Sequence, residues 1–181
     1  MESVTDVQAP PVTRRPWADP VYQALRKAGY AQFPYVPDSG HRDLIELAHA
    51  DLGVIAIPLT TEEEGVAIAA GADLGLSRAV LLMQSSGVGN TINMLSLISH
   101  CAFPFLTLVT LRGDFGEENP WQYGMGQAVE PSLNAVGVLT LRAERPDEVL
   151  PTVEAAIGMV HPGGRAVAVL LTQRLIGAKK F

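Results

Sequence analysis

Short, continuous apolar runs alternate along the chain with longer segments in which apolar positions recur every three or four residues. Continuous runs are typical of strands buried on both faces of a sheet, and the longer spacing is typical of helices. The runs predict strands at residues 32–36, 54–58, 79–83, 105–110, 138–141 and 166–171. The spaced segments predict helices at residues 17–28, 41–52, 61–76, 91–102, 132–136 and 146–160. This alternation predicts an α/β fold: a doubly wound, mostly parallel six-stranded sheet with helices on both faces.

The chain is expected to form one domain behind a short arm. Residues 1–16 are rich in proline, valine and threonine, which favours a flexible N-terminal arm. Residues 17–181 contain no internal repeat, and the full length of 181 residues suits a single domain with a sizeable core.

The charge, the apolar runs and the cysteine count of the chain argue against several classes of protein. The net charge is −6 without a basic cluster, which argues against nucleic-acid binding. No apolar run approaches the ~20 residues of a membrane span, and the N-terminus does not resemble a signal peptide. A single cysteine, Cys101, precludes an internal disulfide, so a reducing cytoplasm is the expected setting. No cysteine and histidine spacing indicates a metal site.

An acidic helix start stands out at residues 61–71, T-E-E-E-G-V-A-I-A-A-G. Thr61 followed by Glu62, Glu63 and Glu64 predicts a helix N-terminus directly after a strand. Two interpretations remain open at this point. The carboxylates could simply complement the helix dipole, or they could belong to a ligand site at the carboxyl edge of the sheet.

Two further loops are expected at the same edge. Residues 37–40 carry Asp38 and Ser39, and residues 84–90, Q-S-S-G-V-G-N, precede the expected helix 91–102. The glycine loop could cradle a phosphate or form a tight strand–helix connection, but it lacks a P-loop lysine and does not fit G-x-G-x-x-G.

Other chemistry is conceivable at this edge. Ser86 could be a nucleophile with His100 or His161 as its partner, although the G-x-S-x-G elbow is missing. Arg112 could bind an anion or form an ion pair with Asp114 or Glu118.

These motifs together resemble a known family. The acidic stretch, followed by L-L-M-Q-S-S-G-V-G-N-T-I-N, resembles the pyrimidine-binding domain of thiamine-diphosphate decarboxylases, in particular the sulfopyruvate and phosphonopyruvate decarboxylase branch. The segment Val36-Pro37-Asp38-Ser39 looks like the V-P-D-S turn of that branch, and Arg112-Gly113-Asp114 looks like its R-G-E segment. The matches run from about residue 36 to residue 127.

The resemblance implies roles for particular residues. Counting back from Gly71 makes Glu62 the catalytic glutamate that hydrogen-bonds the cofactor's aminopyrimidine; aligning on Gly65 would make it Glu63. Cofactor contacts are expected from Glu62 and from the loop residues Ser85, Ser86, Gly87 and Val88. Substrate contacts are expected from Pro37, Asp38, Ser39 and Arg112.

The resemblance also implies that a second, diphosphate-binding domain lies on another chain. Full-length enzymes of the family carry a second domain, marked by G-D-G and a downstream asparagine, that holds the diphosphate through Mg²⁺. This chain offers only Gly113-Asp114-Phe115, so it looks like the alpha subunit of a split 2-oxo acid decarboxylase with a separate beta subunit. A non-catalytic binding or regulatory domain, a carboligase acting on another 2-oxo acid and a hydrolase using Ser85 or Ser86 remain as alternatives.

Self-association is a further expectation. The expected helix 91–102 is apolar on nearly every side, so it should be buried in the core or at an interface, with His100 and Cys101 near that interface.

Overall fold

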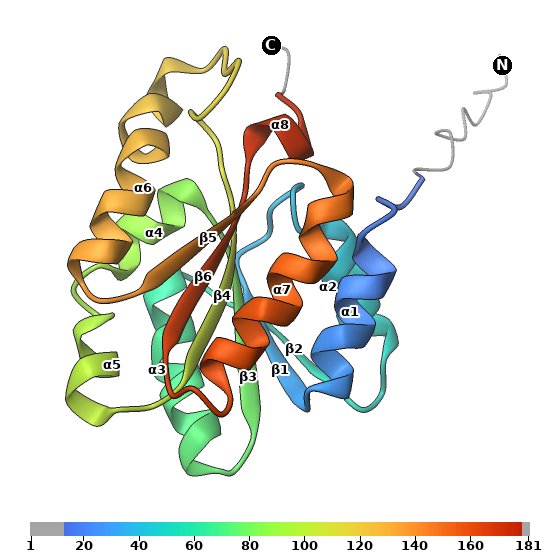
Figure 1. The fold of residues 1–181 in the computed structure, drawn as a ribbon, viewed down its shortest axis with the longest axis vertical. Coiled ribbons are helices and arrows are strands. Elements are labelled where there is room, and N and C mark those ends of the chain that lie inside the picture. The colour runs from blue at the N-terminus through green and yellow to red at the C-terminus, as the bar shows by residue number, and fades with distance from the viewer. Residues whose placement is uncertain (1–12, 179–181) are drawn as a thin grey trace, which may run out of the picture.

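The computed structural model describes residues 13–178, and the fold is a single sheet between two layers of helices (Figure 1). Residues 1–12, most of the expected N-terminal arm, and residues 179–181 lie outside the described residues. No described helix is long and apolar enough to cross a membrane.

The sheet has six strands in the order β2-β1-β3-β4-β6-β5, and every neighbouring pair is parallel. The strands are β1 (Tyr30–Tyr35), β2 (Ile55–Pro58), β3 (Arg78–Gln84), β4 (Phe105–Thr110), β5 (Leu139–Ala143) and β6 (Ala166–Leu171). β3, β4 and β6 are almost entirely buried, as their continuous apolar runs predicted. The predicted fold class is confirmed.

The helices divide into two layers. They are α1 (Ala18–Lys27), α2 (Arg42–Ala50), α3 (Glu62–Leu74), α4 (Ser85–Thr91), α5 (Ser96–Cys101), α6 (Tyr123–Ala135), α7 (Pro146–Val160) and α8 (Gln173–Ile176), with a 3₁₀ turn at Pro120–Gln122. Helices α1, α2 and α7 cover one face of the sheet, and α3 to α6 cover the other (Figure 1). Each layer closes its own apolar cluster against the sheet.

The order of the strands reverses between β1 and β3. From β1 the chain moves outward to β2 through α2, and then returns across β1 to β3 through α3. The helices that follow β1 and β3, α2 and α4, therefore lie on opposite faces (Figure 1). Open α/β sheets bind ligands in the crevice that such a reversal leaves beyond the carboxyl ends of the strands.

The predicted glycine loop is wrong, because residues 85–91 form helix α4. Gly87 and Gly89 serve close packing between helices: a Cβ on Gly89 would lie 3.1 Å from the Met125 sulfur of α6, and one on Gly87 would overlap Glu62 of α3. The residues that suggested a phosphate cradle thus allow three helices to meet.

The single helix predicted over residues 91–102 is also wrong. A turn at residues 92–95 separates α4 from the short α5. The Thr91 hydroxyl donates to the Val88 carbonyl at 2.8 Å, and the Ser96 hydroxyl donates to the Asn93 carbonyl at 2.7 Å. Such local side-chain bonds compete with regular helix bonding, which accounts for the break.

Helix α6 begins at Tyr123, nine residues before the predicted start at 132, and continues through Pro131. Helix α8 was not predicted at all, because its four residues are too few for a periodic signal.

A buried ion pair fixes the segment after β4. Arg112 binds Glu117 through two hydrogen bonds of 2.6 and 2.7 Å, and their side chains are 8% and 1% exposed. The Glu117 carboxylate also accepts a bond of 2.8 Å from Gln173 of α8, whose own oxygen accepts from the backbone amides of Asp114 and Phe115. This network joins the segment after β4 to the segment after β6.

We expect Glu117→Gln to destabilise the fold by roughly 3–5 kcal/mol, because it leaves the Arg112 guanidinium buried without its carboxylate. Urea unfolding at pH 7 measures this change. Glu144→Gln is the matched control: Glu144 is exposed and lies 3.8 Å from Arg142, so its removal should cost less than about 1 kcal/mol.

The same pair predicts a dependence on pH. The Arg112 hydrogen bonds lower the pKa of Glu117 from 4.5 to about 2. A carboxyl with a lowered pKa stabilises the fold above its ordinary pKa, so this contribution should disappear as the pH falls from 4.5 toward 2. Over that interval the wild type should lose more stability than Glu117→Gln; equal losses would contradict the assignment.

Candidate active site

Glu62, the first residue of α3, has a buried carboxyl group. The residue is 6% exposed, and its Oε2 accepts a hydrogen bond of 2.8 Å from the Asn90 amide of α4. Glu63 and Glu64 on the same turn are exposed, and Glu64 accepts a bond of 2.9 Å from the Thr60 amide, which closes the helix start. The three adjacent glutamates therefore occupy different environments, and only Glu62 points into the protein.

Gly87 makes the position of Glu62 possible. A Cβ on Gly87 would lie 2.5 Å from the Glu62 Cδ and closer still to its Oε1. Real Cβ atoms are essentially never found so close to another heavy atom, so any other residue at 87 would displace the carboxyl group. On the same buried face of α3, a Cβ on Gly65 would overlap Leu81 of β3, so Gly65 brings this helix close to the sheet.

Asp38 ties the ends of three strands together. Its carboxylate accepts hydrogen bonds from the Gly40 amide at 2.9 Å, the Thr110 hydroxyl at 2.7 Å and the Gln84 amide at 3.4 Å. These residues follow or end β1, β4 and β3 respectively. Burial alone would raise the pKa of Asp38, but nearby His41 and these three hydrogen bonds hold the pKa below its ordinary value.

His41 is a part of the site that the sequence analysis did not identify. It is fully buried beside Asp38, and its Nε2 lies 3.1 Å from the Met83 carbonyl oxygen. Within the described part of the chain its Nδ1 has no hydrogen-bond partner. Burial lowers the pKa of His41 below its ordinary value, although the Asp38 charge acts in the opposite direction. No periodic signal distinguished this histidine from an ordinary helix-start residue.

Ser85 and Ser86 face different surroundings. Ser85 is fully buried, and its hydroxyl donates to the Arg112 carbonyl at 3.2 Å and accepts from the Arg112 amide at 3.0 Å. Ser86 is exposed and donates to the Gln84 side-chain oxygen at 2.8 Å. Among the described residues, neither serine is hydrogen-bonded to a histidine. Of the other two residues of this segment, Val88 is fully buried and Gly87 contacts Glu62.

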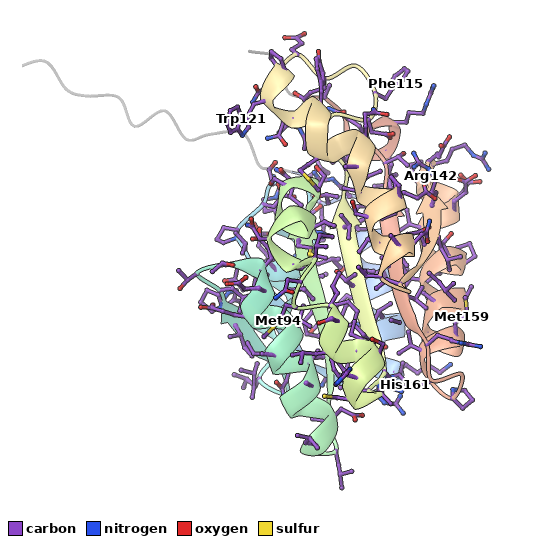
Figure 2. All side chains as sticks on the ribbon, turned by 90° about the vertical axis from the view of Figure 1, so that its left-hand side faces the viewer. Met94, Phe115, Trp121, Arg142, Met159 and His161 are labelled. Carbon is purple, nitrogen blue, oxygen red and sulfur yellow. The ribbon has the colours of Figure 1, made fainter. Side chains whose placement is uncertain are left out.

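The two histidines considered as partners of Ser86 lie elsewhere. His161 packs edge-on against Tyr30 with 5.9 Å between ring centroids, toward the end of the molecule opposite to Trp121 (Figure 2). His100 and Cys101 are exposed on α5. Their expected place at an interface between chains stays a prediction.

Arg112 pairs with Glu117 rather than with the expected Asp114 or Glu118. Asp114 instead pairs with Arg142 at 3.1 Å. The sequence could not have selected Glu117, because three acids follow Arg112 at close spacing and only the folded loop decides which of them is buried.

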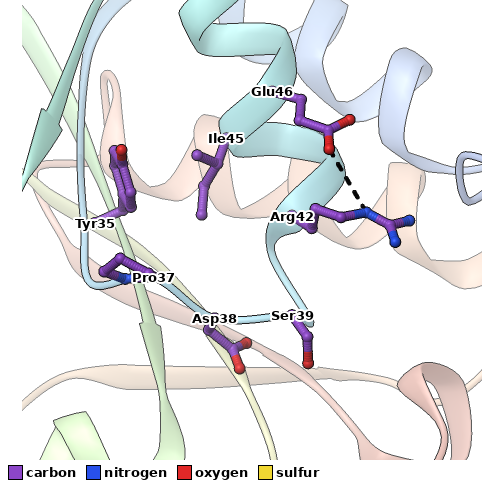
Figure 3. Close-up of a pocket in the computed structure, with 7 residues that line it drawn as sticks. All are labelled: Tyr35, Pro37, Asp38, Ser39, Arg42, Ile45 and Glu46. Carbon is purple, nitrogen blue, oxygen red and sulfur yellow. Dashed lines mark ion pairs between the residues drawn. The ribbon is translucent and has the colours of Figure 1, made fainter. Parts of the chain in front are cut away.

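Two hollows flank the turn after β1. An open one of about 410 Å³ lies between Tyr35, Pro37 and helix α2 (Figure 3). In this view the side chains of Asp38 and Ser39 point away from α2. A more enclosed cavity of about 220 Å³ lies beyond them and reaches Arg112 and Arg15. The expected substrate residues 37–39 and Arg112 thus lie around one region at the carboxyl edge of the sheet.

Comparison with solved structures gives the fold of the domain. The structure resembles part of a 2-oxoglutarate:ferredoxin oxidoreductase from Magnetococcus marinus, with a TM-score of 0.63 and 13% identity over 88% of this chain and 29% of the other. No protein-family model matches the sequence.

The sequence relatives identify a family, whereas the structural comparison gives only the fold. The alpha subunit of sulfopyruvate decarboxylase from Methanocaldococcus jannaschii is 33% identical over 151 residues, which cover 83% of this chain and 89% of that subunit. A sulfopyruvate decarboxylase from Methanosarcina acetivorans is 32% identical over 76% of this chain but only 35% of its own length. A phosphonopyruvate decarboxylase from Streptomyces viridochromogenes is 36% identical over 94 residues, 51% of this chain and 24% of the relative.

These relatives confirm the family resemblance that the motifs suggested. Two further alpha subunits of sulfopyruvate decarboxylase are likewise 33% identical over 85% of this chain. With its parallel α/β sheet and its extensive identity to these subunits, the chain belongs to the family of sulfopyruvate decarboxylase alpha subunits.

Proposed function

We propose that this chain is the pyrimidine-binding subunit of a thiamine-diphosphate-dependent 2-oxo acid decarboxylase. Sulfopyruvate is the favoured substrate, and phosphonopyruvate is the alternative. One observation carries the proposal: the Glu62 carboxyl is buried at the carboxyl edge of the sheet, beside the reversal of strand order, and is held there by Asn90 and Gly87.

The residues present fit the aminopyrimidine of this cofactor. A carboxyl that shares a proton with a ring nitrogen must be held in place and shielded from water, and Glu62 meets both requirements. Because the Asn90 amide already donates to Oε2, Oε1 is the oxygen left to carry the shared proton. The start of α4, from Ser85 to Val88, would form the adjoining wall, where Gly87 leaves room beside the carboxyl.

The division of labour follows from this assignment. Thiamine diphosphate supplies the electron sink for loss of carbon dioxide from a 2-oxo acid. This chain contributes the Glu62 proton at Oε1, the α4 wall, and the turn at residues 37–39 that faces the substrate. Ser85 acts by fixing the Arg112 backbone, not as a nucleophile.

Glu62 is preferred to Glu63 for a physical reason. Glu63 is exposed, so water would compete for any proton that it shared with a cofactor. Glu64 is engaged at the helix start by the Thr60 amide. Glu62 alone of the three combines burial with a fixed orientation.

The diphosphate and its Mg²⁺ are assigned to a separate beta subunit. Two comparisons support this. The relatives that this chain matches over most of their length are named alpha subunits, and the chain corresponds to only 35% of the longer Methanosarcina acetivorans decarboxylase. The remaining length of that protein is ample for a second domain.

The isolated chain should therefore release almost no carbon dioxide from sulfopyruvate with thiamine diphosphate and Mg²⁺ present. Co-expression with a candidate beta subunit, a chain carrying G-D-G and a downstream asparagine, should restore turnover. Carbon dioxide release across a panel of 2-oxo acids measures this. Robust turnover by the chain purified alone would exclude the split enzyme, and an inactive complex with normal cofactor binding would favour a non-catalytic domain.

Glu62→Gln in the complex should lower kcat by about 100-fold or more, because the amide keeps the shape of the side chain but cannot share the proton. Glu63→Gln is the matched control on the same turn and should leave kcat within about threefold. Steady-state kinetics and circular dichroism measure activity and fold. The reverse pattern, with only Glu63→Gln inactive, would overturn the assignment.

Gly87→Ala should also inactivate the complex, because the added methyl group occupies the position of the Glu62 carboxyl. Gly71→Ala in α3 is its control: no atom lies within 4 Å of the Cβ position there. Removing a helical glycine should leave activity intact and stabilise the fold by about 0.5–1 kcal/mol. Kinetics and thermal unfolding of both variants separate a local displacement from general damage.

A further inference from the structure

The cavity of about 220 Å³ beside the turn after β1 has two arginine side chains in its lining that the proposed mechanism does not use. Its walls are Arg15, the turn at residues 38–40, Arg112 and the segment 176–178. Arg15 comes from the N-terminal end of the described chain and residues 176–178 from the other end, so the cavity exists only because both ends fold over the carboxyl edge of the sheet.

Arg15 is fixed in position by hydrogen bonds to Asp43 and Ser39. Its backbone amide and its Nη1 donate to the Asp43 carboxylate at 2.9 and 3.1 Å, and its Nη2 donates to the Ser39 carbonyl at 3.1 Å. A guanidinium has five N–H groups. Within the described residues these bonds use two of them, so the others are left without a protein acceptor. An arginine fixed in this way is ready to bind an anion in a fork geometry.

The arginines around the turn differ in how fully they are paired. Asp43 is shared between Arg15 and Arg42, and Arg42 also lies 3.8 Å from Glu46, so Arg15 has only a share of one carboxylate. Arg112 is balanced by Glu117. Asp38 borders the cavity as a carboxylate, and its oxygens accept bonds from Gly40, Thr110 and Gln84. Because Arg112 is paired with Glu117, the Arg15 guanidinium is the cationic group available to a ligand.

A short chain of contacts links the wall of the cavity to the proposed reaction site. Gln84 donates to Asp38 and accepts from Ser86, and Ser86 directly precedes Gly87, which touches Glu62. The far wall is formed by Ile176, Gly177 and Ala178. The volume of the cavity suits a small anionic group rather than a cofactor.

We propose that Arg15 binds the anionic head group on C3 of the substrate, the sulfonate or phosphonate, inside this cavity. The inference rests on the proposed function, because it assigns the substrate end remote from the bond that breaks. A tetrahedral head group offers three oxygens to the free N–H groups of Arg15. Arg15 thereby selects 2-oxo acids that carry a second negative charge.

The experiment uses the complex with its beta subunit and compares Arg15→Gln, Arg15→Lys and Arg42→Gln. Arg15→Gln should raise KM for sulfopyruvate about 10- to 100-fold with kcat changed less than about threefold, as expected for a lost charged hydrogen bond in binding. Arg15→Lys should recover part of the loss. Arg42→Gln, which removes the other partner of Asp43, should leave KM unchanged.

A merely structural role gives a different result. If Arg15 only steadies the turn at residues 38–40, Arg15→Gln will lower kcat with KM unchanged, or Arg42→Gln will raise KM equally; either outcome overturns the proposal. Repeating the kinetics with phosphonopyruvate tells which head group the cavity prefers.

A binding measurement separates this inference from the proposed function. Calorimetric titration of the full chain with sulfoacetate should give binding that Arg15→Gln abolishes and that acetate does not reproduce. If the complex is inactive toward every 2-oxo acid but this binding is found, the proposed function fails and the anion site stands. If the complex is active but sulfoacetate binds equally well to the wild type and Arg15→Gln, the anion site fails alone.

Discussion

The reversal of strand order between β1 and β3 is the constraint on which the site depends. It sends α2 and α4 to opposite faces of the sheet, so neither helix covers the carboxyl ends of these two strands (Figure 1). Asp38 joins the segments at this edge. It accepts bonds from Gly40 in the turn after β1, from Gln84 at the end of β3 and from Thr110 at the end of β4, and these bonds fix the turn that presents Ser39.

Glu117, Asp38 and Glu62 are buried or partly buried acidic side chains near this edge, and the partners of each carboxyl group differ. Glu117 is neutralised by Arg112, which makes it a structural anchor with a strongly lowered pKa. Asp38 is stabilised as a carboxylate by neutral donors. Glu62 has one amide donor and a glycine beside it, and it forms no ion pair in the described structure. The proposed function gives the shared proton to Glu62, the carboxyl with the fewest bonding partners of the three.

Much of this architecture could be predicted from the sequence. The strands β4 and β6 and the helix α7 coincide with the predicted ranges, because continuous apolar runs and helical periodicity are strong local signals. The segment 84–91 could not be predicted: two glycines suggested a loop, whereas the tertiary contacts with Glu62 and Met125 use them inside a helix. Glu117, Gln173 and His41 were missed because their roles depend on contacts between distant segments.

The central claim is that Glu62 Oε1 meets the aminopyrimidine at an active site shared between two chains. The most direct measurement is a crystal structure of the chain with its beta subunit, thiamine diphosphate and Mg²⁺. The account predicts the Glu62 Oε1 within about 3 Å of a pyrimidine ring nitrogen, with Asn90 still bonded to Oε2 and the diphosphate on the other chain. A pyrimidine bound to Glu63 or to a carboxylate of the partner would contradict it.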